Sequence, residues 1–546
     1  MVSPSVILPL AAWTAPKAHL RGAVLPEVPK DFVVSKAAAR DGVSCSWFKQ
    51  PIDHYNASFG EWSQQYCVSR EWWAGEGSPV VLMTPGEEPI LYSVSPSLGY
   101  TFIDNTTMPG KIAQALGAAT IVLEHRFFGG SSPYDGFDSE TLQYLTMDQA
   151  AADVVNFAEN VVFPFDKNQT SSSKNAPWVY WGASYSAMLG TWLESFHPGV
   201  FHAFHLSSAV VEARAGNWYY YDTIKKGIET LRDKFHPDSA SCSLALPKVA
   251  AWVDSILLDP ARNATKVEAL KALFGSQFPI EDDDFAYAIA TPFRYWQETE
   301  GYIDILDFCD AIVAETNSTT DAILGEVPSI VGNYAAFFKE KFLGKTCTYF
   351  DVRGQDDPLW CLNTHDYLNP FIEARTLGNP WRTWYWFLCN EPIASWATGA
   401  PPDQPSIVSR KIDEAYWQHQ CEMHFPAENG FTYGSANGRK TADTLNKKTG
   451  GWTRNTTRVV WTNGEFDPWR ATTMSSEIRP GGPLQSTDEH PVFLIKNAQH
   501  ADDSFTADGL KSRNIIINPA VQEAQDKVVE VLKKWVSSYY SAKKAS

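Results

Sequence analysis

The chain has 546 residues, of which 44% are hydrophobic and 20% are charged, and its formal net charge is −18. Because this length exceeds that at which single cores stop growing, we expect one large domain with a substantial insertion, or two domains. An acidic surface repels phosphate backbones, so nucleic acid is not an expected partner. No stretch approaches the roughly 20 apolar residues of a membrane helix, and we expect no membrane partner either.

The cysteines and glycosylation sequons indicate the secretory route. There are eight cysteines and none forms a C-x-x-C pair, which favours disulfides over a metal site. Proximity in sequence makes Cys45 and Cys67 a candidate pair. Acceptor sequons for N-glycosylation lie at Asn56, Asn105, Asn168, Asn263, Asn317 and Asn455. We therefore expect a secreted protein, with a vacuolar or lysosomal location as the alternative.

Residues 1–18 have some features of a signal peptide. An apolar run covers 6–13, and Ala15 or Ala18 can precede a cleavage point, but no Lys or Arg lies ahead of the run. The segment is therefore a weak candidate for a signal peptide.

Six runs rich in apolar or β-branched residues have the length of buried strands. In chain order they cover 79–83, 119–123, 178–181, 203–207, 457–462 and 492–495. Helix-like segments at 147–160, after the cap candidate Thr146, and at 185–196 alternate with the early strands. This alternation predicts a mostly parallel sheet, whose functional residues gather at the carboxyl ends of the strands.

The stretch 214–445 interrupts the alternation. It contains amphipathic helices, for example at 221–235 and 266–274, and six of the eight cysteines. We interpret it as a helical cap inserted into a sheet domain made of 40–213 and 446–546. The chain ends in a predicted amphipathic helix at 519–540, which we expect to pack on the sheet.

A candidate nucleophile lies between a strand and a helix, in the sequence Gly182-Ala183-Ser184-Tyr185-Ser186. A nucleophile elbow needs this placement, because a sharp turn lifts the serine hydroxyl above the sheet. The usual second glycine is Ser186 here. From the pentapeptide alone, an ordinary strand-to-helix turn is as good an interpretation.

The rest of the chain supplies the other members of a triad in the order of an α/β-hydrolase: serine, acid, histidine. Asp467 follows the strand at 457–462, with Glu465 as its rival, and Pro468 favours an extended Asp467. His500 follows the last strand, whereas His490 precedes it and falls at the opposite end of the sheet. The sequence therefore predicts an α/β-hydrolase fold with Ser184, Asp467 and His500 at one sheet edge.

The triad fixes what the neighbouring residues should do. His500 accepts the Ser184 proton, and Asp467 orients the imidazole. The oxyanion hole needs two N–H donors, one from Tyr185 and one from the loop containing Gly86 and Glu87. The carboxylates of Glu87 and Glu88 are either solvated in that loop or contact a substrate amine.

Several further motifs carry a resemblance to a known family. They are Pro85-Gly86-Glu87, Glu124-His125-Arg126-Phe127-Phe128-Gly129, 145–150, the Gly-x-Ser-Tyr elbow, Asn463-Gly464-x-x-Asp467-Pro468-Trp469 and 384–389. In these pieces the chain resembles the serine peptidase family of lysosomal Pro-Xaa carboxypeptidase and dipeptidyl peptidase II, and it is most similar to the fungal acid prolyl endopeptidases. It departs from the family at Ala183 and Ala187, where many members have glycine.

The resemblance implies a helical cap, no cofactor, the same triad, and cleavage after proline in peptide or protein substrates at acidic pH. It also supports a disulfide between Cys389 and Cys421. A dipeptidyl peptidase, an esterase or lipase, and a non-catalytic binding protein remain alternatives. The choice between exo- and endopeptidase, and the oligomeric state, stay open.

A site that selects proline needs a tight aromatic pocket. Trp469 is the first candidate for it, because it lies two residues from Asp467. Trp384 and Trp386, in the segment that resembles the family, come next. Each ring is as readily explained as part of the core.

Overall fold

The computed structural model describes residues 43–545 apart from 95–100, 235, 237–239, 277–279, 298–300, 344–362, 368, 370–371, 373–374, 376–379, 392–395, 438–440, 512–514 and 516. The candidate signal segment, Cys347 and Cys361 therefore lie outside the described residues.

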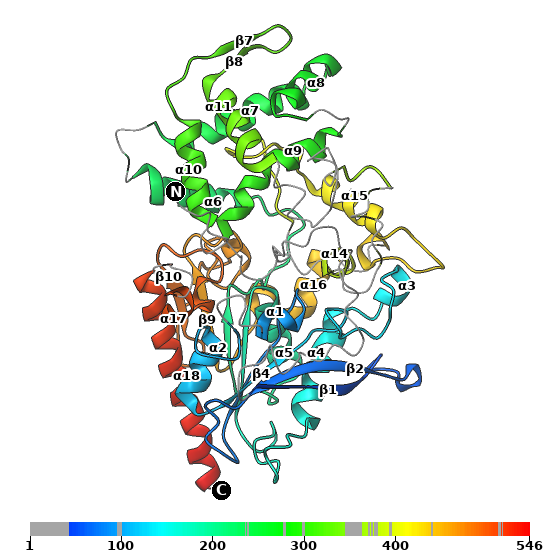
Figure 1. The fold of residues 1–546 in the computed structure, drawn as a ribbon, viewed down its shortest axis with the longest axis vertical. Coiled ribbons are helices and arrows are strands. Elements are labelled where there is room, and N and C mark those ends of the chain that lie inside the picture. Colours follow the sequence, from blue (N-terminus) through cyan, green and yellow to red (C-terminus); the bar gives the residue numbers. More distant parts are fainter. Residues whose placement is uncertain are drawn as a thin grey trace.

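An eight-stranded mixed sheet forms the lower half of the molecule in Figure 1. Its spatial order is β1-β2-β4-β3-β5-β6-β9-β10. The six strands from β4 to β10 run parallel, whereas β2 is antiparallel to both of its neighbours. The bounds are β1 Val43–Pro51, β2 Glu61–Ser69, β3 Val80–Met83, β4 Ala119–Leu123, β5 Trp178–Ala183, β6 Ala203–Ser207, β9 Val459–Gly464 and β10 Val492–Ile495.

The prediction of a parallel sheet is confirmed for these six strands, but the sequence analysis missed the hairpin of β1 and β2. Every residue of β3, β4, β5, β6 and β9 is buried, which gives the continuous apolar runs that mark a central parallel strand. By contrast, β1 is an edge strand with no such run, and most of its residues are partly or fully exposed. The disulfide Cys45–Cys67 joins the directly paired residues of this hairpin.

Helices cover both faces of the sheet. On one face, α2 (Met108–Leu116) packs on β3 and β4, and α18 (Pro519–Ala545) packs on α2 and on β6, β9 and β10. On the other face, α4 (Met147–Asn160) and α5 (Tyr185–Phe196) pack on residues of alternate parity such as Leu82 and Tyr180. The predicted helices at 147–160 and 185–196 are confirmed to the residue, and the Thr146 side chain caps α4 by accepting a hydrogen bond from the Gln149 amide.

The chain leaves the sheet after β6 and returns at β9. In the described part of that stretch the elements are mostly helical: α6 Tyr219–Ile228, α7 Cys242–Leu257, α8 Ala264–Leu273, α9 Asp282–Ala290, η4 Thr291–Gln297, α10 Gly301–Ile312, α11 Ser329–Phe337, α14 Pro380–Asn390, α15 Glu414–His424 and α16 Ala442–Thr449. The small hairpin of β7 (Thr319–Asp321) and β8 (Gly325–Val327) belongs to the same stretch. Most of it lies above the sheet in Figure 1, as an inserted helical region should.

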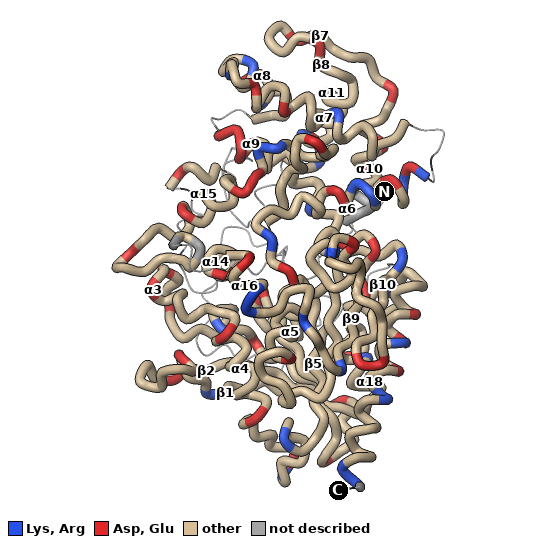
Figure 2. Tube along the Cα trace, turned by 180° about the vertical axis from the view of Figure 1, so that it is seen from behind, with Lys and Arg blue, Asp and Glu red and all other residues tan. Residues whose placement is uncertain are grey.

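Two disulfides hold this inserted region together: Cys242–Cys309 joins α7 to α10, and Cys389–Cys421 joins α14 to α15. Figure 2 shows acidic and basic residues interspersed over the sheet and the inserted region alike. Among the described helices, none combines the length and apolar character needed to cross a bilayer.

Candidate active site

Ser184 lies at the turn between β5 and α5, with backbone angles of φ 55° and ψ −124°. An L-residue with positive φ is strained, and here the strain holds the side chain above the carboxyl end of the sheet. The Ser184 amide donates to the Ser207 carbonyl oxygen at 3.0 Å, which fixes the turn to β6. This is the geometry of a nucleophile elbow.

The residues flanking Ser184 explain why the elbow tolerates the loss of its second glycine. A Cβ atom at Gly182 would come within 2.6 Å of the Ser186 backbone, so this position has no room for a side chain. The Ser186 hydroxyl, in contrast, lies 3.1 Å from Thr84 Oγ1 and 3.2 Å from the Tyr180 hydroxyl oxygen. Its polar atom is thus satisfied in the core beneath the turn.

A chain of short hydrogen bonds links the three predicted triad residues. The distance from Ser184 Oγ to His500 Nε2 is 2.9 Å, and that from His500 Nδ1 to Asp467 Oδ1 is also 2.9 Å. His500 and Asp467 are fully buried. Because a carboxylate only accepts, Nδ1 carries the proton, which leaves Nε2 to accept from the Ser184 hydroxyl. This is the arrangement that a Ser-His-Asp triad needs before it attacks a carbonyl.

The two rival residues lie elsewhere. Glu465, directly after β9, accepts through Oε2 from the Asn497 amide at 3.0 Å, so its carboxylate contacts the loop after β10 rather than His500. His490 lies ahead of β10, where its amide donates to Thr487 Oγ1. Asp467 is held by donors on both oxygens, from Asn463 Nδ2 at 2.7 Å and from the Trp469 amide at 2.9 Å.

Asp503 anchors the loop that carries His500, and the sequence analysis gave it no role. Its carboxylate accepts from Ser207 Oγ at 2.5 Å and Thr462 Oγ1 at 2.6 Å, and lies 3.3 Å from His205 Nε2. These partners come from β6 and β9, so Asp503 connects the His500 loop to the strands below it. The sequence signal for this role of Asp503 is its position three residues after His500.

The residues predicted to form an oxyanion hole lie at the start of α5 and in the loop after β3. The Tyr185 amide is at the first position of α5, where backbone N–H groups have no intrahelical acceptor. Gly86 has a φ of 81°, and a Cβ there would lie 2.9 Å from the Tyr185 ring, so only glycine permits this approach. The Glu87 amide donates to the Pro85 carbonyl at 3.1 Å, a bond with which a bound oxyanion must compete.

His125 fixes the Tyr185 side chain from below, and this too was missed. Its Nδ1 lies 2.8 Å from the Arg126 carbonyl oxygen, and its Nε2 lies 2.8 Å from the Tyr185 hydroxyl oxygen. Because a carbonyl only accepts, Nδ1 is the protonated nitrogen and Nε2 accepts from the tyrosine. Burial lowers the pKa of His125 to about 4, which keeps this tautomer neutral.

A pocket that is partly open to solvent adjoins Ser184. Half of its lining residues are aromatic, and the lining comes from both the sheet domain and the inserted region. The lining residues are Glu87, Ser184, Tyr185, Met188, Val210, Tyr220, Tyr221, Tyr287, Arg294, Gln297, Trp384, Leu388, Trp396, Ala397, Trp417 and Trp469. An apolar pocket with a few polar groups beside a nucleophile is the usual form of a ligand site.

Two of the three predicted tryptophans line this pocket. Trp469 packs edge-to-face on Tyr220 with ring centroids 5.0 Å apart, and its Nε1 donates to Gln297 Oε1 at 3.2 Å. Trp384 packs on Tyr185 in the same way. Trp386 is not a lining residue: it is buried against Phe425, with Nε1 donating to the Leu145 carbonyl. Two residues along a helix point to nearly opposite sides, so α14 presents only one of them to the pocket.

The predicted pair of glutamates also separates. Glu87 lines the pocket, and its two carboxyl oxygens are buried without a hydrogen-bond partner among the described residues. Glu88 is not a lining residue, and its Oε1 accepts from Ser93 Oγ at 3.5 Å. Burial raises the pKa of Glu87 well above its usual value, with a further contribution from Glu88, and burial raises that of Glu88 to about 7.

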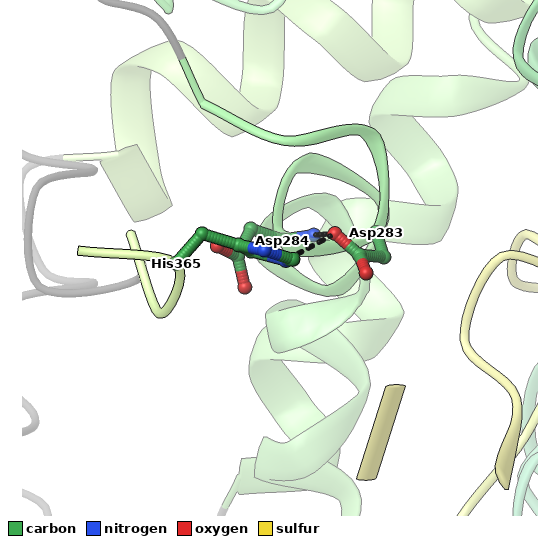
Figure 3. A group of neighbouring side chains, drawn as sticks. All are labelled: Asp283, Asp284 and His365. Carbon is green, nitrogen blue, oxygen red and sulfur yellow. Dashed lines mark hydrogen bonds and ion pairs between the residues drawn. The ribbon is translucent and has the colours of Figure 1, made fainter. Parts of the chain in front are cut away.

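A second group of titratable side chains lies in the inserted region (Figure 3), where Asp283, Asp284 and His365 approach one another. Asp283 Oδ1 lies 3.1 Å from His365 Nε2, and Asp284 accepts from both the amide and the hydroxyl of Thr364. These bonds attach the segment around 363–367 to α9 and occupy the carboxylates, so we assign the group a structural role.

The remaining predictions concern covalent modification. Both expected disulfides, Cys45–Cys67 and Cys389–Cys421, are present, and no described cysteine is free. Among the sequon asparagines, Asn105 is half-buried and the others are exposed: Asn56, Asn168, Asn263, Asn317 and Asn455. Exposure keeps these five positions accessible to a glycan.

Comparisons with known proteins agree with this geometry. The model of the family described as serine carboxypeptidase S28 matches residues 50–518. Two proteins of Bipolaris victoriae are similar over nearly the whole chain: serine protease vicPb, 34% identical over 95% of this chain and 93% of its own, and serine protease vicPa, 35% identical over 91% and 89%. Lysosomal Pro-X carboxypeptidase of Homo sapiens is 22% identical over 93% of this chain and 91% of its own. With its α/β-hydrolase fold and a family match over most of its length, the chain belongs to the serine carboxypeptidase S28 family and is a serine-type peptidase.

Proposed function

We propose that this peptidase cleaves peptide bonds next to proline, with Ser184 as nucleophile, His500 as general base and acid, and Asp467 as the residue that orients His500. The observation that carries the proposal is the continuous hydrogen-bonded path from Ser184 Oγ through His500 to Asp467, opening onto an aromatic pocket. The resemblance to Pro-Xaa carboxypeptidases supports the choice of proline.

The reaction follows from this geometry. His500 Nε2 accepts the Ser184 proton as Oγ attacks the substrate carbonyl, and Asp467 stabilises the resulting imidazolium charge. The Tyr185 amide donates to the oxyanion, together with an amide of the Gly86–Glu87 loop. His500 then passes its proton to the leaving amine, and water repeats the sequence on the acyl-enzyme.

The aromatic wall supplies the selectivity in this proposal. Proline is compact, rigid and lacks an N–H group, so rings that enclose it gain apolar contact without leaving a donor unpaired. Trp469 and Trp384 are the proposed contacts, because they line the pocket that contains Ser184. Trp386 is not proposed for this role.

We also propose that the protein is secreted and that 214–445 form a cap on the hydrolase domain of 40–213 and 446–546. The disulfides and exposed sequons support an oxidising, glycosylating route. Relatives include a probable extracellular serine carboxypeptidase and lysosomal enzymes, which leaves a lysosomal or vacuolar location as the alternative. Treatment of the protein from its native source with an N-glycosidase should reduce its mass.

The direct test is to digest matched peptides that differ only in Pro or Ala at one position, beside a short-chain ester. Mass spectrometry of the products identifies the bond that is cut. We expect cleavage next to Pro at a rate at least about tenfold above that next to Ala, the effect of apolar contacts worth 1–3 kcal/mol. Equal cleavage of both peptides, or turnover of the ester alone, would refute the proposed specificity.

A further inference from the structure

Gln297 is the last residue of η4, and its side chain lies among the aromatic rings of the pocket beside Ser184. The residue is only 4% exposed. Its Oε1 accepts two hydrogen bonds, one from the Tyr220 hydroxyl at 2.9 Å and one from Trp469 Nε1 at 3.2 Å. No step of the reaction proposed above uses this amide.

These two bonds fix which end of the Gln297 amide faces the rings. An indole N–H group can only donate, so the atom opposite Trp469 Nε1 must be the amide oxygen and not the nitrogen. The Tyr220 proton is directed to the same oxygen. Within the part of the chain that the structure describes, nothing accepts from Nε2, and this atom is not one of the unpaired atoms shielded from solvent. The NH2 group is therefore an oriented donor that is open to the pocket.

The position of this donor is tied to the catalytic residues. The preceding residue, Trp296, donates through Nε1 to the Phe466 carbonyl oxygen at 2.9 Å. Trp469, which holds the Gln297 oxygen, donates through its own amide to Asp467 Oδ1 at 2.9 Å. The end of η4 is thus attached to the loop that carries the triad carboxylate, and the NH2 group keeps a fixed place relative to it.

A proline residue inside a peptide offers such a donor a particular partner. Its ring nitrogen has no N–H group, but the same nitrogen bears the carbonyl group of the preceding residue, whose oxygen is an acceptor. A proline that packs on Trp469 brings this carbonyl close to the edge of the tryptophan to which Gln297 is bonded. A donor there can satisfy the oxygen as it loses contact with water.

We propose that Gln297 is a specificity-determining residue, and that its Nε2 donates a hydrogen bond to the carbonyl oxygen of the residue before proline. The inference rests on the proposed peptidase function of the same site, with proline on the acyl side of the cleaved bond. Trp469 then recognises the proline ring and Gln297 recognises the acyl group on its nitrogen. The hydrogen bond between the two side chains keeps these contacts in register.

The test replaces one atom of the substrate. It starts from the proline peptide that the wild type cleaves best and compares it with the same peptide carrying a thioamide in place of the carbonyl before proline. Sulfur accepts a hydrogen bond more weakly than oxygen does, and the cleaved bond itself is unchanged. The quantity measured is the oxo-to-thioxo ratio of kcat/KM. Because both peptides are cleaved by the same enzyme, a general loss of activity in a variant cancels in this ratio.

Gln297→Met removes the donor and keeps the length of the side chain. We expect the oxo-to-thioxo ratio to fall about fivefold from its wild-type value, the size of one neutral hydrogen bond. Gln297→Asn keeps an amide but withdraws it by one methylene, so it should also lower the ratio, and it serves as the test if the first variant does not fold. The control is Gln420→Met. Gln420 lies on α15, donates to Thr364 Oγ1 at 2.6 Å and does not line the pocket. Its replacement should leave the ratio at the wild-type value.

The outcomes separate this inference from the function beneath it. Cleavage next to proline with the same oxo-to-thioxo ratio in the wild type and in folded Gln297 variants would overturn the assignment and leave the peptidase proposal intact. Gln297 would then only support Trp469, and its loss would slow both peptides equally. A fall of the ratio in Gln420→Met as well would also overturn the assignment. Absence of cleavage next to proline in the wild type would overturn both proposals.

Discussion

The hydroxyl group of Tyr185 lies 2.8 Å from Nε2 of His125, a buried histidine whose other nitrogen is bound to a main-chain carbonyl. This bond holds the residue that follows the nucleophile, and the Tyr185 ring in turn packs on Trp384 and Phe387 of the inserted region. The side chain of Tyr185 therefore positions both the amide that we propose for the oxyanion hole and part of the pocket wall.

Tyr185→Phe removes this hydrogen bond and keeps the ring. We expect kcat to fall about tenfold with little change in KM. A less constrained amide would stabilise the transition state less well, whereas its effect on the ground state would be small. The matched control is Tyr334→Phe, which deletes a buried hydroxyl bound to the Ile289 carbonyl away from the pocket lining. A loss of kcat in both variants would indicate general destabilisation rather than a role of Tyr185.

Trp469→Ala tests the proline pocket. Removal of the ring should lower the ratio of cleavage at Pro to cleavage at Ala by about tenfold, as for the loss of 1–3 kcal/mol of apolar contact. Trp386→Phe is the control, since Trp386 belongs to the core: it should lower the thermal midpoint and leave the ratio unchanged. An unaltered ratio in folded Trp469→Ala would assign this tryptophan to the core as well.

The disulfide Cys389–Cys421 should matter for both stability and specificity. It joins α14, which carries Trp384 and Leu388, to α15, which carries Trp417, and all three residues line the pocket. Replacing both cysteines by Ala should reduce the free energy of unfolding by about 4 kcal/mol in the chain-entropy view, and should also reduce the Pro-to-Ala ratio. Replacing Cys45 and Cys67 instead should reduce the free energy of unfolding by a similar amount and leave the Pro-to-Ala ratio unchanged. Denaturant unfolding and peptide kinetics measure the two effects.

Stability should decline from pH 5 to pH 7. Burial raises the pKa of Glu88, Glu124 and Asp502 to about 7. Between about pH 4.5 and pH 7 the folded chain therefore binds more protons than the unfolded chain, so the free energy of unfolding falls as pH rises. His125 acts in the opposite direction below about pH 6.5, because its lowered pKa makes the unfolded chain bind the extra proton.

Glu88→Gln isolates one of these groups. Urea unfolding measures how steeply the free energy of unfolding declines with pH. In the variant this slope should be smaller by up to about 1.4 kcal/mol per pH unit, the value for one proton. The exposed Glu326→Gln serves as the control and should keep the wild-type slope. A slope that Glu88→Gln leaves unchanged would mean that Glu88 ionises alike in the folded and unfolded chains.

The three candidate triad residues could be selected from the sequence because local chemistry and strand order coincide there. Asp467 and His500 were selected over Glu465 and His490 because the carboxyl ends of parallel strands share one edge, and the observed hydrogen bonds follow that choice. The hairpin of β1 and β2 was missed because both of its strands mix polar and apolar residues, although only β1 lies at the sheet edge. Helical periodicity alone separates Trp384 from Trp386, but it does not say which of them faces a pocket.

Other features depend on tertiary contacts that no local pattern encodes. The support of Tyr185 by His125 spans 60 residues of sequence, and the bond between Ser207 and Asp503 spans 296. The isolation of Glu87 follows from the close approach of the β3 loop to α5 and the inserted region. Sequence alone presents it as one of two adjacent loop glutamates.

Covalent labelling with a fluorophosphonate, followed by mapping of the adduct by peptide mass spectrometry, tests the proposed triad most directly. We expect one adduct, on Ser184, with loss of peptidase activity in parallel. Labelling should be absent in Ser184→Ala and slower by about a thousandfold or more in His500→Ala, because triad members act as a unit. His490→Ala should label as the wild type. An adduct on another serine, or full labelling and activity of His500→Ala, would contradict the assignment of Ser184, His500 and Asp467 as the catalytic triad.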